Sequence, residues 1–296
     1  MTHPSAAESI QATDTTSIAF LGGGNVARAL ISCLLRSGKN PGHIAIGEPV
    51  EAARDALARE FGVRVHADNA AAVAGARVVV LAVKPQECAR VLAAAAAAVR
   101  DSAALLLSVA AGVRIANLQR LCPGVPVIRV MPNRPVLLGA GASGAYAPPD
   151  TAPALHQWTE RIFGAAGRLV WLQRESDLDL VTALSGSGPA YFFLLAEQLA
   201  AAAITQGLAP ETARLLAAET LYGAGQLAHA SVSTAADVPA SARESLAQQR
   251  EAVTSRGGTT AAALEVLAAA DFNGLVARAL HSAARRSAEL AALLDS

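Results

Sequence analysis

The chain has 296 residues, 53% of them hydrophobic and 16% charged, so it can bury a full core and is not intrinsically disordered. Its 24 basic and 24 acidic side chains cancel, which argues against nucleic acid or an anionic membrane as a partner and favours a small-molecule ligand. The apolar runs at 91–99 and 192–204 are too short, or interrupted by Glu197, to span a bilayer, so we expect a soluble cytoplasmic protein.

The first segment, residues 1–16, is polar and has neither the basic start nor the apolar stretch of a secretory signal, so a flexible tail is expected there. Cys33, Cys88 and Cys122 lack the C-x-x-C spacing of metal or redox sites and are expected to stay reduced. The six histidines include no i, i+4 pair near a carboxylate, so no metal site is expected.

Between residues 17 and 172, short β-branched runs alternate with alanine-rich helical stretches. This alternation predicts an α/β domain, a Rossmann-like doubly wound parallel sheet with helices on both faces. The expected strands are 17–21, 44–46, 63–65, 78–83, 105–109, 125–130 and 169–172. The first two helices, 26–36 and 50–60, are each followed by a glycine, the usual helix stop signal.

The rest of the chain, 173–296, shows no strand signal and predicts an all-helical second domain with helices at 191–206, 210–229, 241–253, 260–270 and 274–294. These helices carry alanine or leucine on nearly every face, more apolar surface than one small domain can bury. We therefore expect two copies to interleave them in a homodimer, with a larger assembly such as a decamer possible in principle. An alanine-rich composition with ordinary surface helices is the alternative.

The first glycine cluster has the pattern G-x-G-x-x-A between a predicted strand and a predicted helix. Gly22 permits the tight turn, Gly24 lets the backbone approach a pyrophosphate, and Ala27 allows close helix packing. In this strand–turn–helix context the pattern predicts a dinucleotide site formed by Gly22, Gly23, Gly24, Asn25 and Val26. A glycine-rich turn without a ligand is the alternative.

Glu48 follows the second predicted strand, where a carboxylate can accept from the adenosine ribose hydroxyls and would repel a 2′-phosphate, which favours NADH. Arg54, further along, could instead reach that phosphate, so the choice between NADPH and NADH stays open. Glu48 could also be only a first-turn helix charge favoured by the helix dipole.

Five further segments resemble, in order and spacing, the signature blocks of pyrroline-5-carboxylate reductases. They are Ala82-Val83-Lys84-Pro85, Ser108-Val109-Ala110-Ala111-Gly112, Met131-Pro132-Asn133-Arg134-Pro135, Ser185-Gly186-Ser187-Gly188-Pro189-Ala190-Tyr191, and Val253 through Thr260. The resemblance covers nearly the whole chain after Ser17. It implies reduction of 1-pyrroline-5-carboxylate to L-proline by NAD(P)H, the last step of proline biosynthesis.

The resemblance also implies which residues bind the cofactor at the carboxyl ends of the strands, where open parallel sheets bind ligands. They are Asn69, Ala82, Val83, Lys84, Pro85, Val109, Ala110 and Ala111, with Pro189 in the block placed against the nicotinamide. Lys84 could be catalytic, but it could equally hold backbone carbonyls or a cofactor phosphate.

The last block opens a predicted helix with free backbone N–H groups, which suit a carboxylate. The resemblance implies that Ser255, Gly257, Gly258, Thr259 and Thr260 bind the cyclic imine acid, and that the catalytic Thr260 turns its hydroxyl toward the ring nitrogen. In a dimer this block could come from the partner chain. The alternative is a glycine turn capped by a threonine, without a ligand.

Two residues depart from the family pattern: Arg134 stands where threonine is usual and Arg256 where proline is usual. Arg256 could strengthen anion binding or loosen a turn that proline would hold rigid, and Arg134 adds a bulky charge near the expected cleft.

The implied mechanism is direct hydride transfer to the C5 carbon of the protonated imine, with the protein supplying alignment and electrostatics. The alternatives are another imine reductase, a β-hydroxyacid dehydrogenase of the same architecture, and a non-catalytic dinucleotide-binding regulatory protein. A dehydrogenase commonly uses a lysine base in its second domain, and this chain has only Lys39 and Lys84, which argues against it.

Overall fold

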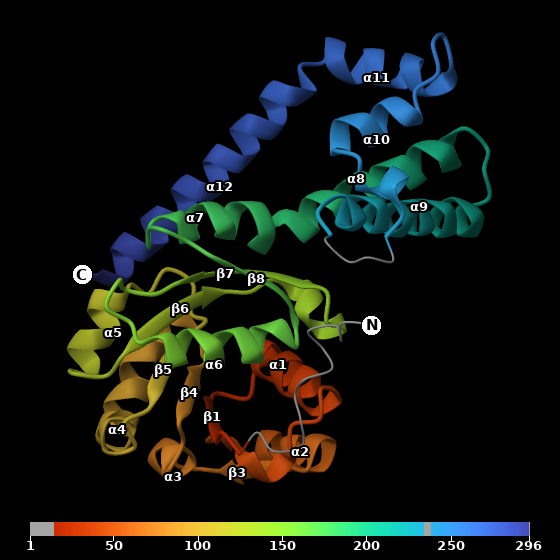
Figure 1. Cartoon of the computed structure of the whole chain (residues 1–296). Helices are drawn as coiled ribbons and strands as arrows, with labels where there is room; N and C mark the ends of the chain where they lie inside the picture. The colour runs from red at the N-terminus through yellow and green to blue at the C-terminus, as the bar shows by residue number, and fades with distance from the viewer. Residues whose placement is uncertain (1–14, 234–237, 296) are drawn as a thin grey trace. The chain divides into compact units, whose positions relative to one another are not determined.

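The computed structural model describes residues 15–233 and 238–295 (Figure 1). Most of the tail expected at 1–16 therefore lies outside the described residues. The chain groups into two compact units. Unit 1 comprises the described chain up to Ser187 together with Ser282 onward, and unit 2 is Gly188–His281. The division into 17–172 and 173–296 stays a prediction about which segments fold independently.

An eight-stranded sheet forms the centre of unit 1, in the order β3-β2-β1-β4-β5-β6-β7-β8. The strands are β1 (Ile18–Leu21), β2 (Ile44–Gly47), β3 (Arg64–His66), β4 (Val78–Leu81), β5 (Leu105–Ser108), β6 (Val127–Met131), β7 (Gly141–Tyr146) and β8 (Gly167–Trp171). The first six are parallel, as their β-branched runs predict. The predicted α/β class with a Rossmann-like sheet is confirmed.

Strand β7 was not predicted, and it pairs antiparallel to β6 and parallel to β8, so the last two strands depart from the expected parallel order. Its sequence, Gly-Ala-Ser-Gly-Ala-Tyr, lacks the β-branched residues that mark a strand. The structure gives the reason. A Cβ at Gly144 would lie 2.8 Å from Val181 Cγ2, and one at Gly141 would lie 2.8 Å from the Ala166 carbonyl oxygen, so close packing requires small residues here.

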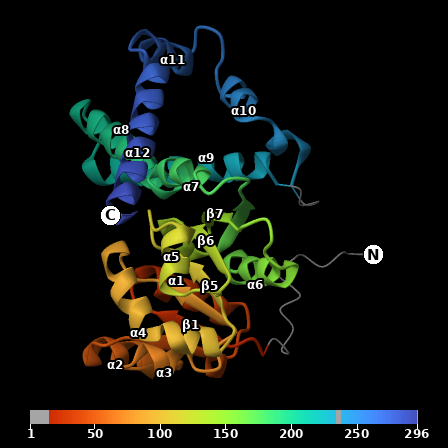
Figure 2. The same cartoon turned by 90° about the vertical axis from the view of Figure 1, so that its left-hand side faces the viewer.

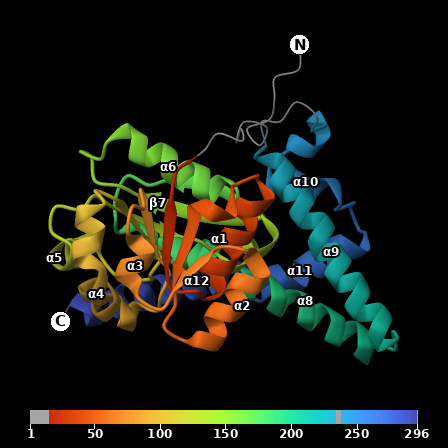
Figure 3. The ribbon, with the colours of Figure 1, turned by 90° about the horizontal axis from the view of Figure 1, so that it is seen from below.

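Helices cover both faces of the sheet (Figures 2 and 3). One face packs on α1 (Asn25–Arg36), α2 (Glu51–Phe61) and α6 (Pro153–Gly164). The other packs on α3 (Asn69–Val73), α4 (Cys88–Asp101) and α5 (Ile115–Leu121). Alternate residues of β1 serve the two cores, with Phe20 on the first and Leu21 on the second, both fully buried.

Unit 1 also contains α7 (Asp177–Val181), a π-helical turn at Thr182–Gly186, and the C-terminal end of α12 (Phe272–Asp295). The π turn is marked by the bond from Ser187 N to Thr182 O, at 2.8 Å. It contains the first residues of the Ser-Gly-Ser-Gly block, and such single π turns are frequent at functional sites.

Unit 2 consists of α8 (Gly188–Thr205), α9 (Pro210–Ser231), α10 (Leu246–Ala252), α11 (Thr259–Ala269) and the first part of α12, with α8 and α9 side by side (Figure 1). The single helix predicted at 241–253 is wrong. A short 3-10 turn, Ala240–Arg243, comes first, and α10 begins after Ser245, whose side chain forms a capping box with Gln248.

Little of unit 2 is buried. Among its described residues only Gly188, Ala200 and Ala213 are buried, whereas Phe192 and Phe193 are 58% and 57% exposed. By length and composition the continuous helix Asp177–Thr205 could cross a membrane, and so could the bent pair formed by α11 and α12. The sequence analysis excluded a span at 192–204 because of Glu197, but the helix meets the length and composition requirement despite it. Apolar surface of this extent needs a covering partner.

Candidate dinucleotide and carboxylate sites

Three loops leave the sheet side by side at the carboxyl ends of its central strands. Leu21, Leu81 and Ser108 are in register at the ends of β1, β4 and β5. The hydrogen-bond ladder continues one residue beyond β4 and β5: Ala82 N donates to Leu21 O at 2.9 Å, and Val109 N donates to Leu81 O at 3.2 Å. The segments at 22–24, 82–85 and 109–111 are thus brought together at the strand ends, where open α/β sheets bind ligands.

The glycine turn after β1 has the shape that its sequence predicts. Gly22 has φ +96°, and a Cβ there would lie 2.6 Å from Val83 Cγ1. Gly24 is the N-cap of α1, and the first intrahelical bond runs from Arg28 N to Gly24 O at 3.0 Å. No side chain of the described residues caps this helix. The first-turn amides, including those of Asn25 and Val26, are therefore free for an anion.

Glu48 lies against this turn. Its Oε2 accepts from Gly23 N at 3.3 Å and its Oε1 from Val50 N at 3.1 Å, which fixes the carboxylate beside the glycine loop. Arg54 Nη1 donates to the carbonyl oxygens of Glu48 and Pro49, at 3.0 and 2.7 Å. The guanidinium is therefore held on the backbone.

Asn69 begins α3, which is capped by the Asp68 side chain. Its Oδ1 is buried and has no hydrogen-bond partner among the described residues, and a Cβ at Gly47 would lie 2.2 Å from it. A buried acceptor without a donor costs about 1–3 kcal/mol, which a ligand donor can offset. The orphaned acceptor, the uncapped α1 and the crowded Gly22 fit a bound dinucleotide.

Lys84 is exposed and precedes a 3-10 turn, Pro85–Glu87, whose Glu87 N donates to Lys84 O. Its backbone thus shapes the turn. Ala110 is 5% exposed, and its N–H donates to Ser108 Oγ at 3.4 Å, so the loop after β5 is folded onto the core.

The glycine-threonine block lies in unit 2, at the start of α11. Gly258 N donates to Ser255 O at 3.0 Å and Gly257 has φ +68°, which together make a tight turn. Gly258 is the N-cap, and the first intrahelical bond is donated by Ala262 N to Gly258 O. No side chain of the described residues caps α11, so the amides of Thr259 and Thr260 face outward from the helix start and suit a carboxylate.

The two arginines that depart from the family pattern are both exposed. Arg256 occupies the second position of the Ser255–Gly258 turn, where proline is favoured because its ring presets φ. Arg134 begins a 3-10 turn, Arg134–Leu138, in unit 1. Pro189 is the second residue of α8 in unit 2, and its contact with the nicotinamide stays a prediction.

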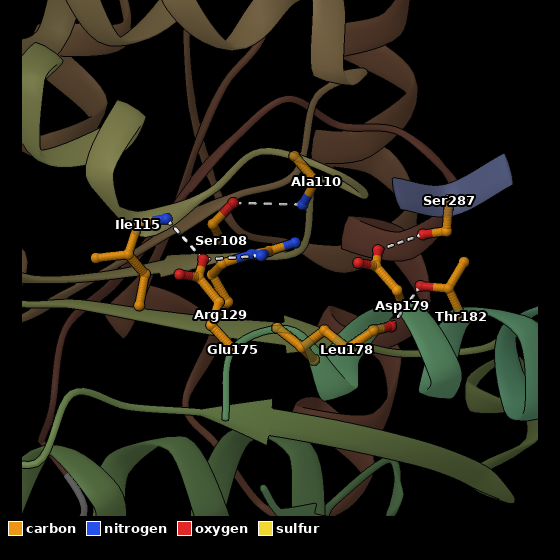
Figure 4. A network of polar contacts seen from close by, with 9 residues as sticks. All are labelled: Ser108, Ala110, Ile115, Arg129, Glu175, Leu178, Asp179, Thr182 and Ser287. Atoms are coloured by element: carbon orange, nitrogen blue, oxygen red, sulfur yellow. Dashed lines mark hydrogen bonds and ion pairs between the residues drawn. The ribbon is translucent and has the colours of Figure 1, made fainter. Parts of the chain in front are cut away.

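A partly buried polar network beside the β5 loop was not expected (Figure 4). Glu175 Oε1 accepts from Arg129 Nη1 and from Ile115 N, both at 2.8 Å, and so caps the start of α5. Arg129, in β6, is only 8% exposed. The one sequence signal was a charged residue in the apolar run Val-Ile-Arg-Val-Met, which requires a partner.

Among the described residues, no group of three or more His, Cys, Asp or Glu side chains could hold a metal ion. The three cysteines are buried and free. Burial, helped by Glu87, raises the pKa of the Cys88 thiol from 9.0 to about 12, and burial also raises the pKa of Cys122. Both thiols are therefore unreactive core residues near neutral pH.

Known proteins match this chain over both of its structural units. A family model described as pyrroline-5-carboxylate reductase dimerisation matches residues 175–290, and one described as NADP oxidoreductase, coenzyme F420-dependent, matches residues 17–112. The pyrroline-5-carboxylate reductase of Pseudomonas aeruginosa is 42% identical over 94% of this chain and 97% of its own length. The chain belongs to the pyrroline-5-carboxylate reductase family.

Other pyrroline-5-carboxylate reductases agree in sequence and in fold. That of Haemophilus influenzae is 39% identical over 93% of this chain and 98% of its own length. The solved structure of the Coxiella burnetii reductase is 34% identical, covers 94% of this chain and 99% of its own, and gives a TM-score of 0.86. A Plasmodium falciparum pyrroline carboxylate reductase, solved with NADP bound, shares the fold with a TM-score of 0.78 at 24% identity over 93% of this chain and 98% of its own. The resemblance predicted from the sequence blocks is confirmed.

Proposed function

We propose that the protein reduces 1-pyrroline-5-carboxylate to L-proline with hydride from a reduced nicotinamide dinucleotide, as the last step of proline biosynthesis in the cytoplasm. The observation that carries the proposal is the near-full-length identity of about 40% to pyrroline-5-carboxylate reductases, joined to strand-end loops that fit a dinucleotide. When bound, the dinucleotide supplies the hydride that reduces a C=N bond.

The protein's own residues bind and orient. The free amides of the α1 start, from Gly24 to Val26, hold the pyrophosphate. The loops at 82–85 and 109–111 and the orphaned Asn69 amide oxygen line the strand ends and fix the rest of the cofactor. Pro189 contributes a rigid contact to the nicotinamide.

The substrate carboxylate binds the amides at the start of α11, with Ser255 to Thr260 forming the turn around it. Thr260 places its hydroxyl at the ring nitrogen, where it holds the proton that makes the imine electrophilic. The half-buried position of Thr260 allows a hydroxyl contact with a ligand.

We expect Thr260→Ala to lower kcat with pyrroline-5-carboxylate by 10- to 100-fold, because general acid assistance is lost, while the Kd for the dinucleotide changes less than twofold. Thr260→Ser, which keeps the hydroxyl, should recover most of the rate. Steady-state kinetics and a fluorescence titration of the cofactor measure both. Equal losses of turnover and cofactor binding would show that Thr260 serves the fold instead.

Between the two nicotinamide dinucleotides, the geometry favours NADH. Glu48 presents a fixed carboxylate beside the glycine loop, which would accept from a ribose hydroxyl and repel a 2′-phosphate. Arg54 would have to break two hydrogen bonds to carbonyl groups before it could reach that phosphate.

The Kd for NADPH should therefore exceed that for NADH by tenfold or more, about 1.4 kcal/mol. Glu48→Gln should reduce the difference between the Kd values for NADPH and NADH, since it removes the charge but keeps an acceptor. Glu51→Gln removes an equal charge from the exposed first turn of α2 and should leave the ratio unchanged. Calorimetric titration of all three proteins with both dinucleotides measures these Kd values. Equal affinities of the wild type for NADH and NADPH would contradict the preference for NADH.

The assembly we propose is a homodimer through unit 2. An apolar groove of 690 Å³ runs between α8 and α9 and is also lined by Leu246 of α10. A groove of this kind, in a unit with almost no core of its own, suits a helix from a second copy. A decamer would need additional contacts between dimers.

A dinucleotide-binding regulatory protein without activity is the second candidate, and Arg256 in the substrate turn is the feature that favours it. Purified protein that binds NADH but oxidises none of it with pyrroline-5-carboxylate would support this alternative and overturn the proposed enzyme.

A further inference from the structure

The C-terminal end of α12 packs against the loop that joins β5 to α5. A Cβ at Gly112 would lie 3.3 Å from both Cα and N of Ala291, so the loop backbone and the helix backbone are almost in contact. Gly112 has φ +78° and is buried, and Ala291 is 3% exposed. The positive φ and the close helix backbone disfavour a side chain at Gly112, and burial leaves Ala291 with almost no exposed surface.

Two polar contacts fix the helix on either side of this approach. Ser287 Oγ donates to Asp179 Oδ1 of α7 at 2.7 Å, and Asn117 Nδ2 of α5 donates to Leu294 O at 3.4 Å (Figure 4 shows the first). Residues 287, 291 and 294 are spaced i, i+4, i+7 and therefore share one face of the helix. That face contacts α7, the loop and α5 in turn.

The loop itself is fixed at both ends. At its start Val109 N continues the ladder to Leu81 O, and at its end Ile115 N donates to Glu175 Oε1. Between these points, the three atoms nearest to a Cβ at Gly112 all belong to α12: Cα and N of Ala291, and Leu294 Cδ1 at 3.5 Å. A shift of α12 would therefore be taken up by residues 109–112.

From this geometry we infer that the C-terminal end of α12 is a positioning element for the cofactor loop, with Ala291 and Ser287 as its positioning residues. The inference rests on the proposed function, because it takes Val109 to Ala111 as lining the dinucleotide. A preformed loop binds its ligand without paying an ordering cost, so displacing it lowers affinity first and the rate at saturation less.

The test compares Ala291→Leu with Ala292→Leu. Both add the same side chain to the same helix turn, but position 291 is buried against Gly112 and position 292 is exposed. We expect Ala291→Leu to raise the Kd for NADH at least tenfold in a fluorescence titration, to raise the KM for NADH in parallel, and to change kcat at saturating NADH less than threefold. Ala292→Leu should bind NADH like the wild type, and Ala291→Gly, which adds no volume, should retain the wild-type affinity.

Ser287→Ala, which removes the hydroxyl donor to Asp179 without adding volume, should raise the Kd for NADH three- to fivefold and decides the question if Ala291→Leu does not fold. Folded Ala291→Leu or Ser287→Ala with a Kd within twofold of the wild type would overturn the inference and leave the proposed function intact. No NADH binding by the wild type would overturn both.

Discussion

At the residue scale, Glu175 serves two partners that are far apart in sequence. Its carboxylate neutralises the buried Arg129 and caps the amide of Ile115, so one side chain connects β6, α5 and the start of α7. Removing one partner of a buried ion pair leaves the other charge unpaired, which costs more than the pair itself contributes.

Glu175→Ala should therefore lower the free energy of unfolding by about 3 kcal/mol, because it leaves both the Arg129 guanidinium and the Ile115 N–H group without this hydrogen-bond acceptor. Arg174→Ala removes an exposed ion pair with Asp177 and should change the free energy of unfolding far less than Glu175→Ala does. Urea unfolding at one fixed protein concentration compares the two variants. Similar midpoints for both would contradict the structural role given to Glu175.

The sequence shows some of these residues and not others, for a physical reason. The glycine turn and Glu48 are local features, and the roles proposed for them follow from a strand, a turn and the next strand. Glu175 lies 60 residues from the amide it caps, and Ser287 lies 108 residues from Asp179, so no local pattern reveals either bond. The sequence therefore predicts the glycine turn and Glu48, but not the long-range hydrogen bonds of Glu175 and Ser287.

At the scale of elements, the parallel strands were predictable and β7 was not. Runs such as Val-Val-Val-Leu in β4 signal burial on both faces, whereas β7 is built from small residues selected by close packing. The tightest approach joins β7 to β8, where a Cβ at Gly167 would lie 2.1 Å from the Gly141 carbonyl oxygen. Gly167 also has φ +139°.

Gly167→Ala should destabilise the protein by about 3 kcal/mol or more, because both the backbone angle and the neighbouring strand exclude a side chain. Gly164→Ala, at the end of α6, meets no atom within 4 Å and should be neutral or slightly stabilising. Thermal melts of the two variants provide the comparison, and a melting temperature of Gly167→Ala equal to that of the wild type would refute this account of β7.

At the scale of the whole molecule, the burial pattern separates unit 1 from unit 2. Unit 1 has two complete cores, one on each face of its sheet, whereas unit 2 has three buried residues in its described part. The all-round apolar character of the C-terminal helices was visible in the sequence, and it predicted the need for a partner. Which faces meet in the assembly was not visible, because alanine and leucine occur on all of them.

Phe192→Glu places a charge in the apolar groove of unit 2 and should convert the proposed dimer to a monomer at micromolar concentration. Leu138→Glu makes the same change at a residue of unit 1 that is 86% exposed, and should leave the dimer intact. Light scattering after size-exclusion chromatography measures the masses. A dimer that survives Phe192→Glu would argue for a different interface.

Because unit 2 has so small a core, its folding should depend on the concentration of the protein. If the α8–α9 surface is covered only by another copy, then mass action sets how much of the helical unit is folded, and dilution removes stability without any chemical change. Activity per molecule would then decline over time in nanomolar assays and return on reconcentration.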